Sequence, residues 1–233
     1  MKLLIIIPCY NEASSIGSLL EQIRQIKLAE DILPDWVVVN DCSKDNTSQI
    51  AMQHGAKVLD LPVNLGIGGA MQTGYKYAAQ SGYDLAVQLD GDGQHPPQEL
   101  QKLIDEYLQF KCNIVIGSRF IVKQGFQSSA LRRMGIKYLH WISKILTGKN
   151  IYDITSGYRL FDKKAIEIAA KYYPDDYPEP ESLVVFSRSG LTISEVPVIM
   201  KERQGGRSSI KNFQQLYYIV KVTIAMFFSS IRK

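Results

Sequence analysis

The 233-residue chain is poor in cysteine and has no long apolar run. Its three cysteines, Cys9, Cys42 and Cys112, are too few and too irregular for a disulfide framework, which favours a reducing compartment. No segment approaches the roughly 20 apolar residues that cross a bilayer. The apolar start, Met1 to Pro8, is too short for a secretory signal and no small-residue cleavage site follows it, so we expect a strand there.

Strong net charge, repeats and the common nucleotide loops are also lacking. A net charge of +4, with 45% hydrophobic and 21% charged residues, is typical of one globular α/β domain and excludes a disordered chain. The glycine-rich stretch 64–69 fails as a dinucleotide loop because Met71 stands where the third glycine belongs. No Walker lysine motif occurs, and the loop 8–12 has no basic residue, which disfavours a nucleotidyltransferase.

Strands and helices are expected to alternate along the first half of the chain. Apolar runs predict strands at 3–7, 36–40, 57–61, 85–89 and 113–117, and helical spacing predicts helices at 13–26, 48–54, 68–81 and 96–110. This order predicts a doubly wound, parallel sheet with its ligand loops at one edge. In the second half we expect helices at 130–146, 179–189 and 213–229 and short strands at 158–161 and 192–196. One α/β domain would span 1–209, followed by a terminal amphipathic helix over 210–233.

Two carboxylates follow the strand predicted at 85–89. It runs directly into Asp90-Gly91-Asp92-Gly93-Gln94, at the edge where open α/β sheets bind ligands. Oxygen ligands at this spacing suit Mg²⁺ or Mn²⁺ shared with a substrate diphosphate, and the glycines permit close approach. An acidic β-turn explains the same residues equally well.

Two other predicted strands also end in polar loops. After the first, Pro8, Tyr10, Asn11 and Glu12 can pack against and hydrogen-bond a nucleobase, or Asn11 and Glu12 can simply begin a helix. After the second, Asp41 can accept a hydrogen bond from a base N–H.

Together these motifs resemble family 2 of the inverting glycosyltransferases, which have the GT-A nucleotide-sugar fold. Four motifs occur in family order over almost the whole chain, namely Pro8-Cys9-Tyr10-Asn11-Glu12, Asn40-Asp41-Cys42-Ser43-Lys44-Asp45-Asn46-Thr47, Asp90-Gly91-Asp92-Gly93-Gln94 and Gly117-Ser118-Arg119. The stretches 153–159 and 202–209 are similar to the polyprenyl-phosphate branch, typified by dolichyl-phosphate mannose synthase. The stretch 176–181 looks closest to short bacterial members that lack transmembrane helices.

The resemblance implies a role for each matching residue. The nucleotide sugar would be held by Pro8, Tyr10, Asn11, Glu12, Asp41, Asp90, Gly91, Asp92, Arg203 and Arg207. A Mg²⁺ or Mn²⁺ ion would be bound by Asp90, Asp92 and Gln94, and Arg119 would face the acceptor phosphate. Two positions depart from the family pattern. Asn40 replaces an acidic residue, and Ser209 replaces a lysine whose charge Arg207 is our candidate to supply.

The implied reaction places catalytic roles on Asp92, Arg119 and Asp153. Charge builds on the leaving diphosphate, where a divalent ion and guanidinium groups stabilise it. The acceptor phosphate, whose second pKa is about 6, is largely ionised at pH 7 and needs positioning more than deprotonation. Asp153 can orient the acceptor or act as a weak base, or it can merely pair with Arg159. His95 is expected to be an ordinary loop histidine because hard cations prefer oxygen.

Two segments suit a membrane surface. The segment 131–147 has four Lys/Arg and no acid, among them Arg132, Arg133 and Lys137, which favours an interfacial helix on an anionic leaflet. Its predicted lipid face consists of Leu139, Ile142, Ile145 and Leu146, with Tyr138 and Trp141 near the boundary, although a surface helix packed on the core is the alternative. Near the C-terminus an apolar seam recurs every three or four residues, at Ile210, Phe213, Tyr217, Val220, Ile224, Phe227 and Ile231.

The sequence therefore predicts a metal-dependent, inverting transferase that moves a sugar from UDP-GlcNAc or UDP-glucose to undecaprenyl phosphate, for cell-wall or surface-polysaccharide synthesis. One alternative is a dolichyl-phosphate mannose synthase that uses GDP-mannose. Another is a catalytically degenerate nucleotide-binding or membrane-interaction protein. We expect a cytoplasmic protein held peripherally on the inner face of the cell membrane, with no nucleic-acid partner. The C-terminal helix would dock a small membrane protein or a second copy of the chain.

Overall fold

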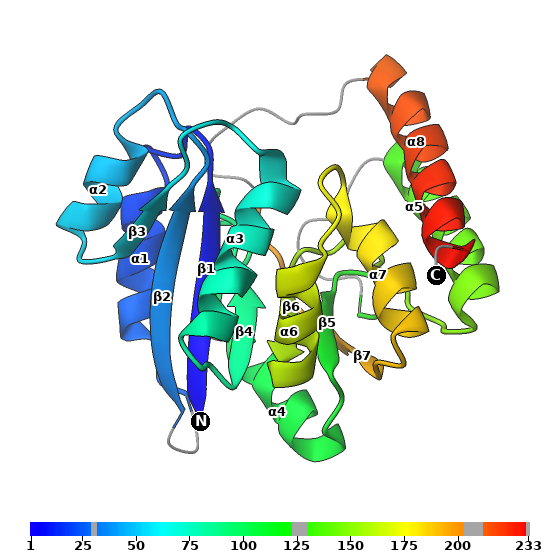
Figure 1. Ribbon diagram of the computed structural model, residues 1–233, viewed down its shortest axis with the longest axis horizontal. Coiled ribbons are helices and arrows are strands. Elements are labelled where there is room, and N and C mark those ends of the chain that lie inside the picture. The colour runs from blue at the N-terminus through cyan, green and yellow to red at the C-terminus, as the bar shows by residue number, and fades with distance from the viewer. Residues whose placement is uncertain (29–31, 123–129, 203–211, 232–233) are drawn as a thin grey trace.

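A seven-stranded sheet runs through the centre of the molecule, in the order β3-β2-β1-β4-β6-β5-β7, with helices on both faces (Figure 1). The computed structural model describes residues 1–28, 32–122, 130–202 and 212–231. The strands are β1 (Lys2–Cys9), β2 (Leu33–Asn40), β3 (Lys57–Asp60), β4 (Leu85–Gln88), β5 (Ile114–Ser118), β6 (Arg159–Asp162) and β7 (Ile193–Pro197). The helices are α1 (Ile16–Gln25), α2 (Thr47–Gln53), α3 (Gly66–Gln80), α4 (Leu100–Phe110), α5 (Ala130–Thr147), α6 (Lys163–Lys171), α7 (Pro178–Arg188) and α8 (Asn212–Ile231), and a 3₁₀ turn, Pro97–Glu99, precedes α4.

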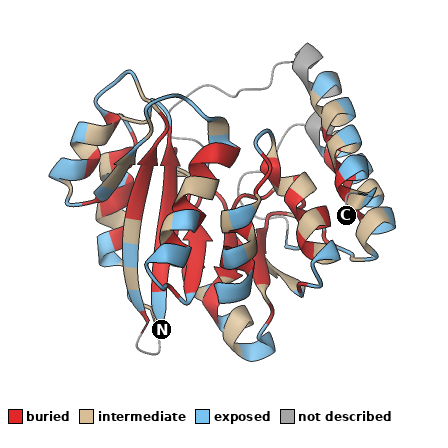
Figure 2. Ribbon diagram, viewed as in Figure 1, coloured by how far each residue is buried: buried red, intermediate tan, exposed pale blue. Residues whose placement is uncertain are grey.

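Both faces of the sheet are covered, which explains why its central strands are apolar without alternation. β1 is buried from Leu3 to Cys9. On one face α1, α2 and α4 bury a cluster that includes Leu103. On the other face α3, α6 and α7 bury a cluster in which Tyr75 stacks on Phe161, with 4.8 Å between ring centroids, and Phe161 meets Phe186 edge-on. Figure 2 shows these buried strands between partly exposed helices.

The strand directions bring the ligand loops to one edge. β1 lies between β2 and β4 and is parallel to both. β6 is antiparallel to β4 on one side and to β5 on the other, so β4 and β5 point the same way. The chain therefore leaves β1, β2, β4 and β5 at the same edge, as the parallel pattern predicted.

Two features of the second half differ from the prediction. β6 runs against its neighbours, and helix α6, which was not predicted, follows β6 without a loop. Asp162 ends the strand, and its carboxylate accepts the backbone N–H of Ala165 at 2.8 Å, which caps the new helix. A four-residue strand and a nine-residue helix joined by one capping residue are too short for periodicity to separate.

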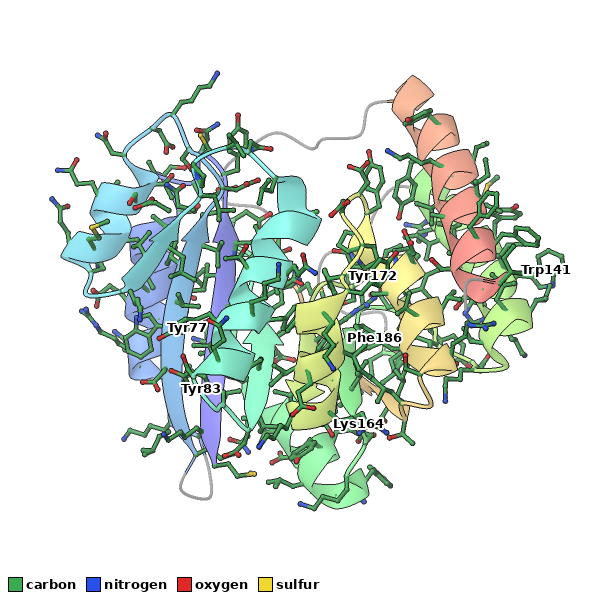
Figure 3. All side chains as sticks on the ribbon, viewed as in Figure 1. Tyr77, Tyr83, Trp141, Lys164, Tyr172 and Phe186 are labelled. Carbon is green, nitrogen blue, oxygen red and sulfur yellow. The ribbon has the colours of Figure 1, made fainter. Side chains whose placement is uncertain are left out.

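Helices α5 and α8 pack together and on α7 at one end of the molecule (Figure 1). The predicted lipid face of α5 was partly wrong, because Leu139 is fully buried and Ile142 and Leu146 pack against the core. The exposed apolar stripe of α5 instead consists of Met134, Tyr138, Trp141 and Ile145, between 41% and 65% exposed. Trp141 projects outward from this helix (Figure 3).

The C-terminal seam is exposed in the described part of the chain. α8 turns Val222, Met226 and Ser229 inward. The seam residues Tyr217, Val220, Ile224, Phe227 and Ile231 are each at least 50% exposed, while the side chains of Ile210 and Phe213 lie outside the described part of the chain. No helix within the described ranges is both apolar enough and long enough to cross a bilayer.

Candidate active site

The loops that follow β1 and β2 are hydrogen-bonded to each other. Asn11 has a positive φ of 58°, its backbone N–H donates to Ser43 Oγ at 2.9 Å, and its side-chain oxygen accepts from the Lys44 N–H at 2.8 Å. Asn11 is therefore not the cap of α1, which begins four residues after Glu12. Tyr10 is 46% exposed at the rim of these loops.

Glu12 joins this loop to the start of α1. Its carboxylate accepts from the Ser15 hydroxyl at 2.9 Å, and its carbonyl accepts the backbone N–H of Ser15 and of Ile16. The helix-start reading of Glu12 is thus correct at the level of local structure. The carboxylate still belongs to the loop where the nucleoside was predicted to bind.

Asp41 holds the start of α3. Its two carboxylate oxygens accept the backbone N–H groups of Leu65 at 2.7 Å and Gly66 at 2.9 Å. Burial raises the pKa of Asp41, and these two hydrogen bonds oppose the shift only in part. The neighbouring Asn40 donates to Asp60 of β3 at 2.7 Å, so a carboxylate from another strand lies beside the position where the family pattern has one.

The predicted metal motif forms a tight turn after β4. The Gly93 N–H donates to the Asp90 carbonyl at 3.2 Å, with a φ of 77° at Gly93 that favours glycine. Asp90 Oδ1 accepts from the Gln88 amide at 2.9 Å, and the Asp90 N–H donates to His95 Nδ1 at 3.1 Å. His95 is buried and stacks on Tyr158, so it supports the turn rather than facing a ligand, as predicted.

The turn rests directly on the end of β1. A Cβ at Gly91 would lie 2.6 Å from Cys9 Sγ, which only glycine avoids. Burial raises the pKa of Cys9, and the negative charges of Glu12, Asp90 and Asp92 raise it further. Asp45 of the loop after β2 adds to this effect, so four carboxylates from three loops act on a single sulfur atom.

This donor set fits a hard divalent cation. Asp92 is buried, and its Oδ1 accepts the Gln94 N–H at 2.9 Å, whereas the Asp90 side chain is 29% exposed. Among the described residues no three His, Cys, Asp or Glu side chains form a cluster that could bind a metal alone. An ion held by Asp90, Asp92 and Gln94 would thus need phosphate oxygens and water to complete its shell, as Mg²⁺ and Mn²⁺ commonly do.

Arg119 and Asp153 form a buried ion pair at the end of β5. Arg119 Nε donates to Asp153 Oδ2 and Arg119 Nη2 to Oδ1, both at 2.7 Å, and the Arg119 backbone N–H adds a third bond at 3.0 Å. Burial disfavours the charge, but Asp153, followed by Asp90 and Glu179, raises the pKa of Arg119. Arg119 therefore lies within electrostatic reach of the Asp90 turn.

Arg159 is not the partner of Asp153, which corrects the alternative drawn from the sequence. Its fully buried guanidinium donates to the Ser182 hydroxyl and to the carbonyls of Ser156, Ile154 and Glu179. Arg159 thereby ties β6 to the start of α7. The sequence spacing favoured Arg159 as the partner of Asp153 because it is the nearer arginine in the chain. In the fold Arg119 pairs with Asp153 instead, because β5 ends beside the 152–155 loop.

A cavity of about 790 Å³ opens beside Arg119. Among the described residues it is lined by Phe120, Ile121, Arg133, Ile136, Lys137, His140 and Tyr152. The Arg119 guanidinium lies 5.4 Å from the centre of the Phe120 ring, which joins the ion pair to the cavity wall. The lining combines the positive charges of Arg133 and Lys137 with the imidazole of His140 and four apolar or aromatic side chains.

Sequence reasoning assigned Arg133 and Lys137, with Arg119 and Arg132, to the acceptor or the membrane surface but missed His140 and Tyr152. The rings of these two residues stack at 5.6 Å and 6°, and His140 Nδ1 is hydrogen-bonded to the Ile151 carbonyl. Glu195, also missed, accepts the backbone N–H groups of Tyr152 and Asp153. The sequence signal for Glu195 was only an acid within a short predicted strand.

Three predicted residues cannot be placed in the site. Arg203 and Arg207 lie outside the described residues, and so does the side chain of Arg132. The described site has two parts, the carboxylate-rich loops after β1, β2 and β4 and the basic cavity after β5. Arg119 stands between them.

Comparison with known proteins gives a consistent assignment. A family model described as "Glycosyl transferase family 2" matches residues 4–168. An undecaprenyl-phosphate mannosyltransferase from Micrococcus luteus is 31% identical over 222 residues, which cover 90% of this chain and 88% of that protein. A UDP-N-acetylglucosamine–dolichyl-phosphate N-acetylglucosaminyltransferase from Methanococcus voltae is 30% identical over 83% of each chain.

Solved structures share the fold. Glucosyl-3-phosphoglycerate synthase from Mycobacterium tuberculosis, in complex with Mn²⁺, UDP and glucosyl-3-phosphoglycerate, superposes with a TM-score of 0.69 at 20% identity. The match covers 98% of this chain and 79% of that one. The same enzyme has also been crystallised with Mg²⁺ and UDP. The similarity confirms the expected α/β architecture, the GT-A fold with a mostly parallel sheet flanked by helices.

Proposed function

Because the chain belongs to glycosyl transferase family 2, we propose that it transfers a hexose from a nucleotide sugar to a polyprenyl phosphate. The donors we favour are UDP-GlcNAc and UDP-glucose, and the acceptor is undecaprenyl phosphate, for cell-wall or surface-polysaccharide synthesis. Relatives of this chain are named for polyprenyl- or dolichyl-phosphate as acceptor and for mannose, N-acetylglucosamine or glucose as sugar.

One observation carries the proposal: the basic, half-apolar cavity next to Arg119. Arg133 and Lys137 offer positive charge to a phosphate, while Phe120, Ile121 and Ile136 offer apolar surface to the first isoprene units. A purely polar acceptor would leave those apolar groups in water. A polyprenyl phosphate can place its phosphate against the basic side chains and its isoprene units against the apolar ones.

The opposite part of the site suits the donor. The nucleoside would lie on the loops after β1 and β2, against Tyr10, with the diphosphate at the Asp90–Gly93 turn. We assign Asp90, Asp92 and Gln94 to a Mg²⁺ or Mn²⁺ ion, which supplies positive charge for the leaving diphosphate when bound. The negative charges of Asp90 and Asp92 favour a cation at this place, because without one they would oppose the binding of an anionic diphosphate.

The transfer itself is a single displacement. An oxygen of the acceptor phosphate forms a bond to the anomeric carbon, the bond from that carbon to the diphosphate oxygen breaks, and its electron pair leaves with the nucleoside diphosphate. The acceptor enters from the side of Arg119, opposite the leaving group, which inverts the anomeric centre. Arg119 holds the nucleophilic phosphate in line, and Asp153 holds Arg119, so Asp153 acts by positioning rather than as a base.

Membrane contact follows from the acceptor. The lipid tail needs a bilayer surface, and the α5 stripe with the α8 seam gives an exposed apolar area on two helices that pack together. Arg133, Lys137 and Lys144 on α5 add positive charge for an anionic leaflet. We place the protein peripherally on the inner face of the cell membrane, with a small membrane protein or a second copy as further candidates for the seam.

The competing assignment is mannose transfer, which the name of the Micrococcus luteus relative favours, with GDP-mannose as the donor we would expect for it. Incubation with undecaprenyl phosphate and a panel of labelled UDP- and GDP-sugars, with Mn²⁺ or Mg²⁺ and with or without liposomes, decides between them. We expect lipid-linked label from UDP-GlcNAc or UDP-glucose. Label from GDP-mannose alone would overturn the donor, and no lipid-linked product from any donor would overturn the function.

A further inference from the structure

Glu195 holds the loop that forms one wall of the acceptor cavity. It lies on the edge strand β7, paired with Ile116 of β5. Its two carboxylate oxygens accept consecutive backbone N–H groups, from Tyr152 at 2.8 Å and from Asp153 at 2.6 Å. A carboxylate that accepts two adjacent amide groups fixes the direction of that backbone more firmly than a single bond can.

Both residues that Glu195 fixes lead into the acceptor site. Asp153 carries the carboxylate that grips Arg119 at two points. Tyr152 stacks on His140, and both rings line the cavity. One carboxylate outside the cavity therefore sets the place of Arg119 on one side and of His140 on the other.

The sheet itself does not require this side chain. β5 and β7 are paired through their backbones from Ile114 to Ser118. The preceding residue on β7, Ser194, binds Glu106 of α4 on the other face, which gives the same strand a second anchor. Burial raises the pKa of Glu195, and the nearby Asp153 charge adds to the shift, so keeping a carboxylate here carries a cost.

We propose that Glu195 is a positioning residue for the phosphate acceptor, acting through the Tyr152–Asp153 backbone on Arg119 and His140. The inference rests on the proposed function, because it assigns the cavity to the acceptor. Glu195 touches neither substrate in this account. Its loss should therefore affect acceptor use and leave donor binding intact.

The test compares Glu195→Gln and Glu195→Ala with Ser194→Ala as a matched control on the same strand. Steady-state kinetics with a short-chain, detergent-soluble polyprenyl phosphate gives the KM for each substrate, and calorimetry gives the affinity for UDP with Mn²⁺. We expect Glu195→Gln to raise the acceptor KM about tenfold, as removal of supporting partners of a site residue commonly does. Glu195→Ala should raise it further, while the donor KM and UDP affinity change less than about twofold.

A double-variant cycle separates positioning from a general loss of structure. If Glu195 acts through Arg119, then Glu195→Gln should change the acceptor KM much less in an Arg119→Lys background than in the wild type. Equal effects in both backgrounds, or equal rises in donor and acceptor KM, would overturn the positioning role. Normal acceptor KM in both Glu195 variants would do the same while leaving the proposed function intact. A wild type that binds UDP but transfers to no polyprenyl phosphate would overturn both.

Discussion

Asp153 and Arg119 form a two-point ion pair whose side chains are 0% and 10% exposed, between the carboxylate-rich loops and the basic cavity. Asp153 is fully buried, Arg119 is nearly so, and Thr155 is hydrogen-bonded to both. The pair explains how a buried arginine stays in one orientation with its face toward Phe120. It also removes Asp153 from the set of free bases.

Asp153→Asn should destabilise the protein by about 3–5 kcal/mol, because it leaves a buried guanidinium without its counter-charge. Asp176→Asn is the matched control, since Asp176 pairs with Lys221 at the surface, where its side chain is 67% exposed. That change should cost less than about 1 kcal/mol. Urea denaturation at pH 7 measures both, and equal losses would contradict a buried, structural role for the pair.

Gly91→Ala should disturb the Asp90 turn, because the new Cβ would lie 2.6 Å from Cys9 Sγ and 3.1 Å from the Pro8 carbonyl oxygen. We expect a loss of about 1–3 kcal/mol in stability, the usual cost of overpacking, together with weaker binding of UDP and Mn²⁺. The second change Cys9→Ala removes the nearer atom and should restore part of both. No rescue in the double variant would show that the contact with Cys9 is not the cause.

Asp92→Asn should keep the fold and lose most of the turnover, by several kcal/mol of transition-state stabilisation. The substitution is isosteric and removes one of the four negative charges that act on Cys9, so stability should hold or rise. Calorimetry should show UDP binding that no longer depends on Mn²⁺. Full activity of Asp92→Asn in the presence of EDTA would exclude a metal at this turn.

The parallel part of the fold could be predicted because its strands are apolar on both faces and end in distinctive polar loops. The side-chain pairing in the second half of the chain could not be predicted. Arg159 and Asp153 are close in sequence, but β6 runs antiparallel between β4 and β5 and carries Arg159 to Ser182. Arg119 reaches Asp153 only because β5 ends beside that loop, and such proximity is a property of the tertiary fold.

Helix α5 shows a second limit of prediction from sequence, because apolar periodicity does not tell which side of a helix is buried. The apolar periodicity of 131–147 predicts an amphipathic helix correctly, but this helix has apolar residues on two sides. Leu139 faces the core and Trp141 faces outward. Which side is covered depends on α7 and α8, which pack against α5 from later in the chain. The role of Glu195 could not be predicted from the sequence either, because its partners are backbone groups of a distant loop.

The free energy of unfolding should depend on pH through Asp45, which lies in the loop after β2. Burial opposes its charge, but hydrogen bonds from the Thr47 hydroxyl and the Ala13 N–H outweigh it, so the pKa of Asp45 lies below its usual 3.8. A lowered pKa in the folded state gives stability that is present above the unfolded pKa and lost as pH falls through the folded pKa.

The difference in unfolding free energy between wild type and Asp45→Asn should therefore be constant above about pH 5 and shrink below it. Urea titrations from pH 3 to pH 6 at fixed ionic strength measure it. A difference that grows as pH falls, or that does not change, would contradict the stated role of Asp45.

The exposed stripe on α5 should govern binding to anionic bilayers. Trp141 and Ile145 are 58% and 59% exposed on the same helix as Lys137 and Lys144. Entry of two such side chains into the interface should contribute at least about 1.4 kcal/mol, so the Trp141→Ser/Ile145→Ser variant should bind liposomes at least about tenfold more weakly.

The matched control is Phe110→Ser, since Phe110 is equally exposed, at 59%, but ends α4 away from α5 and α8 (Figure 1). Co-sedimentation with phosphatidylglycerol vesicles should separate the two variants, and added salt should weaken wild-type binding because the basic residues contribute. Transfer to a short, detergent-soluble polyprenyl phosphate should be the same in all three proteins, because the stripe lies outside the cavity. If the α5 variant sediments like the wild type, the stripe is not the anchor, and the exposed seam of α8 from Tyr217 to Ile231 is the apolar surface left to supply it.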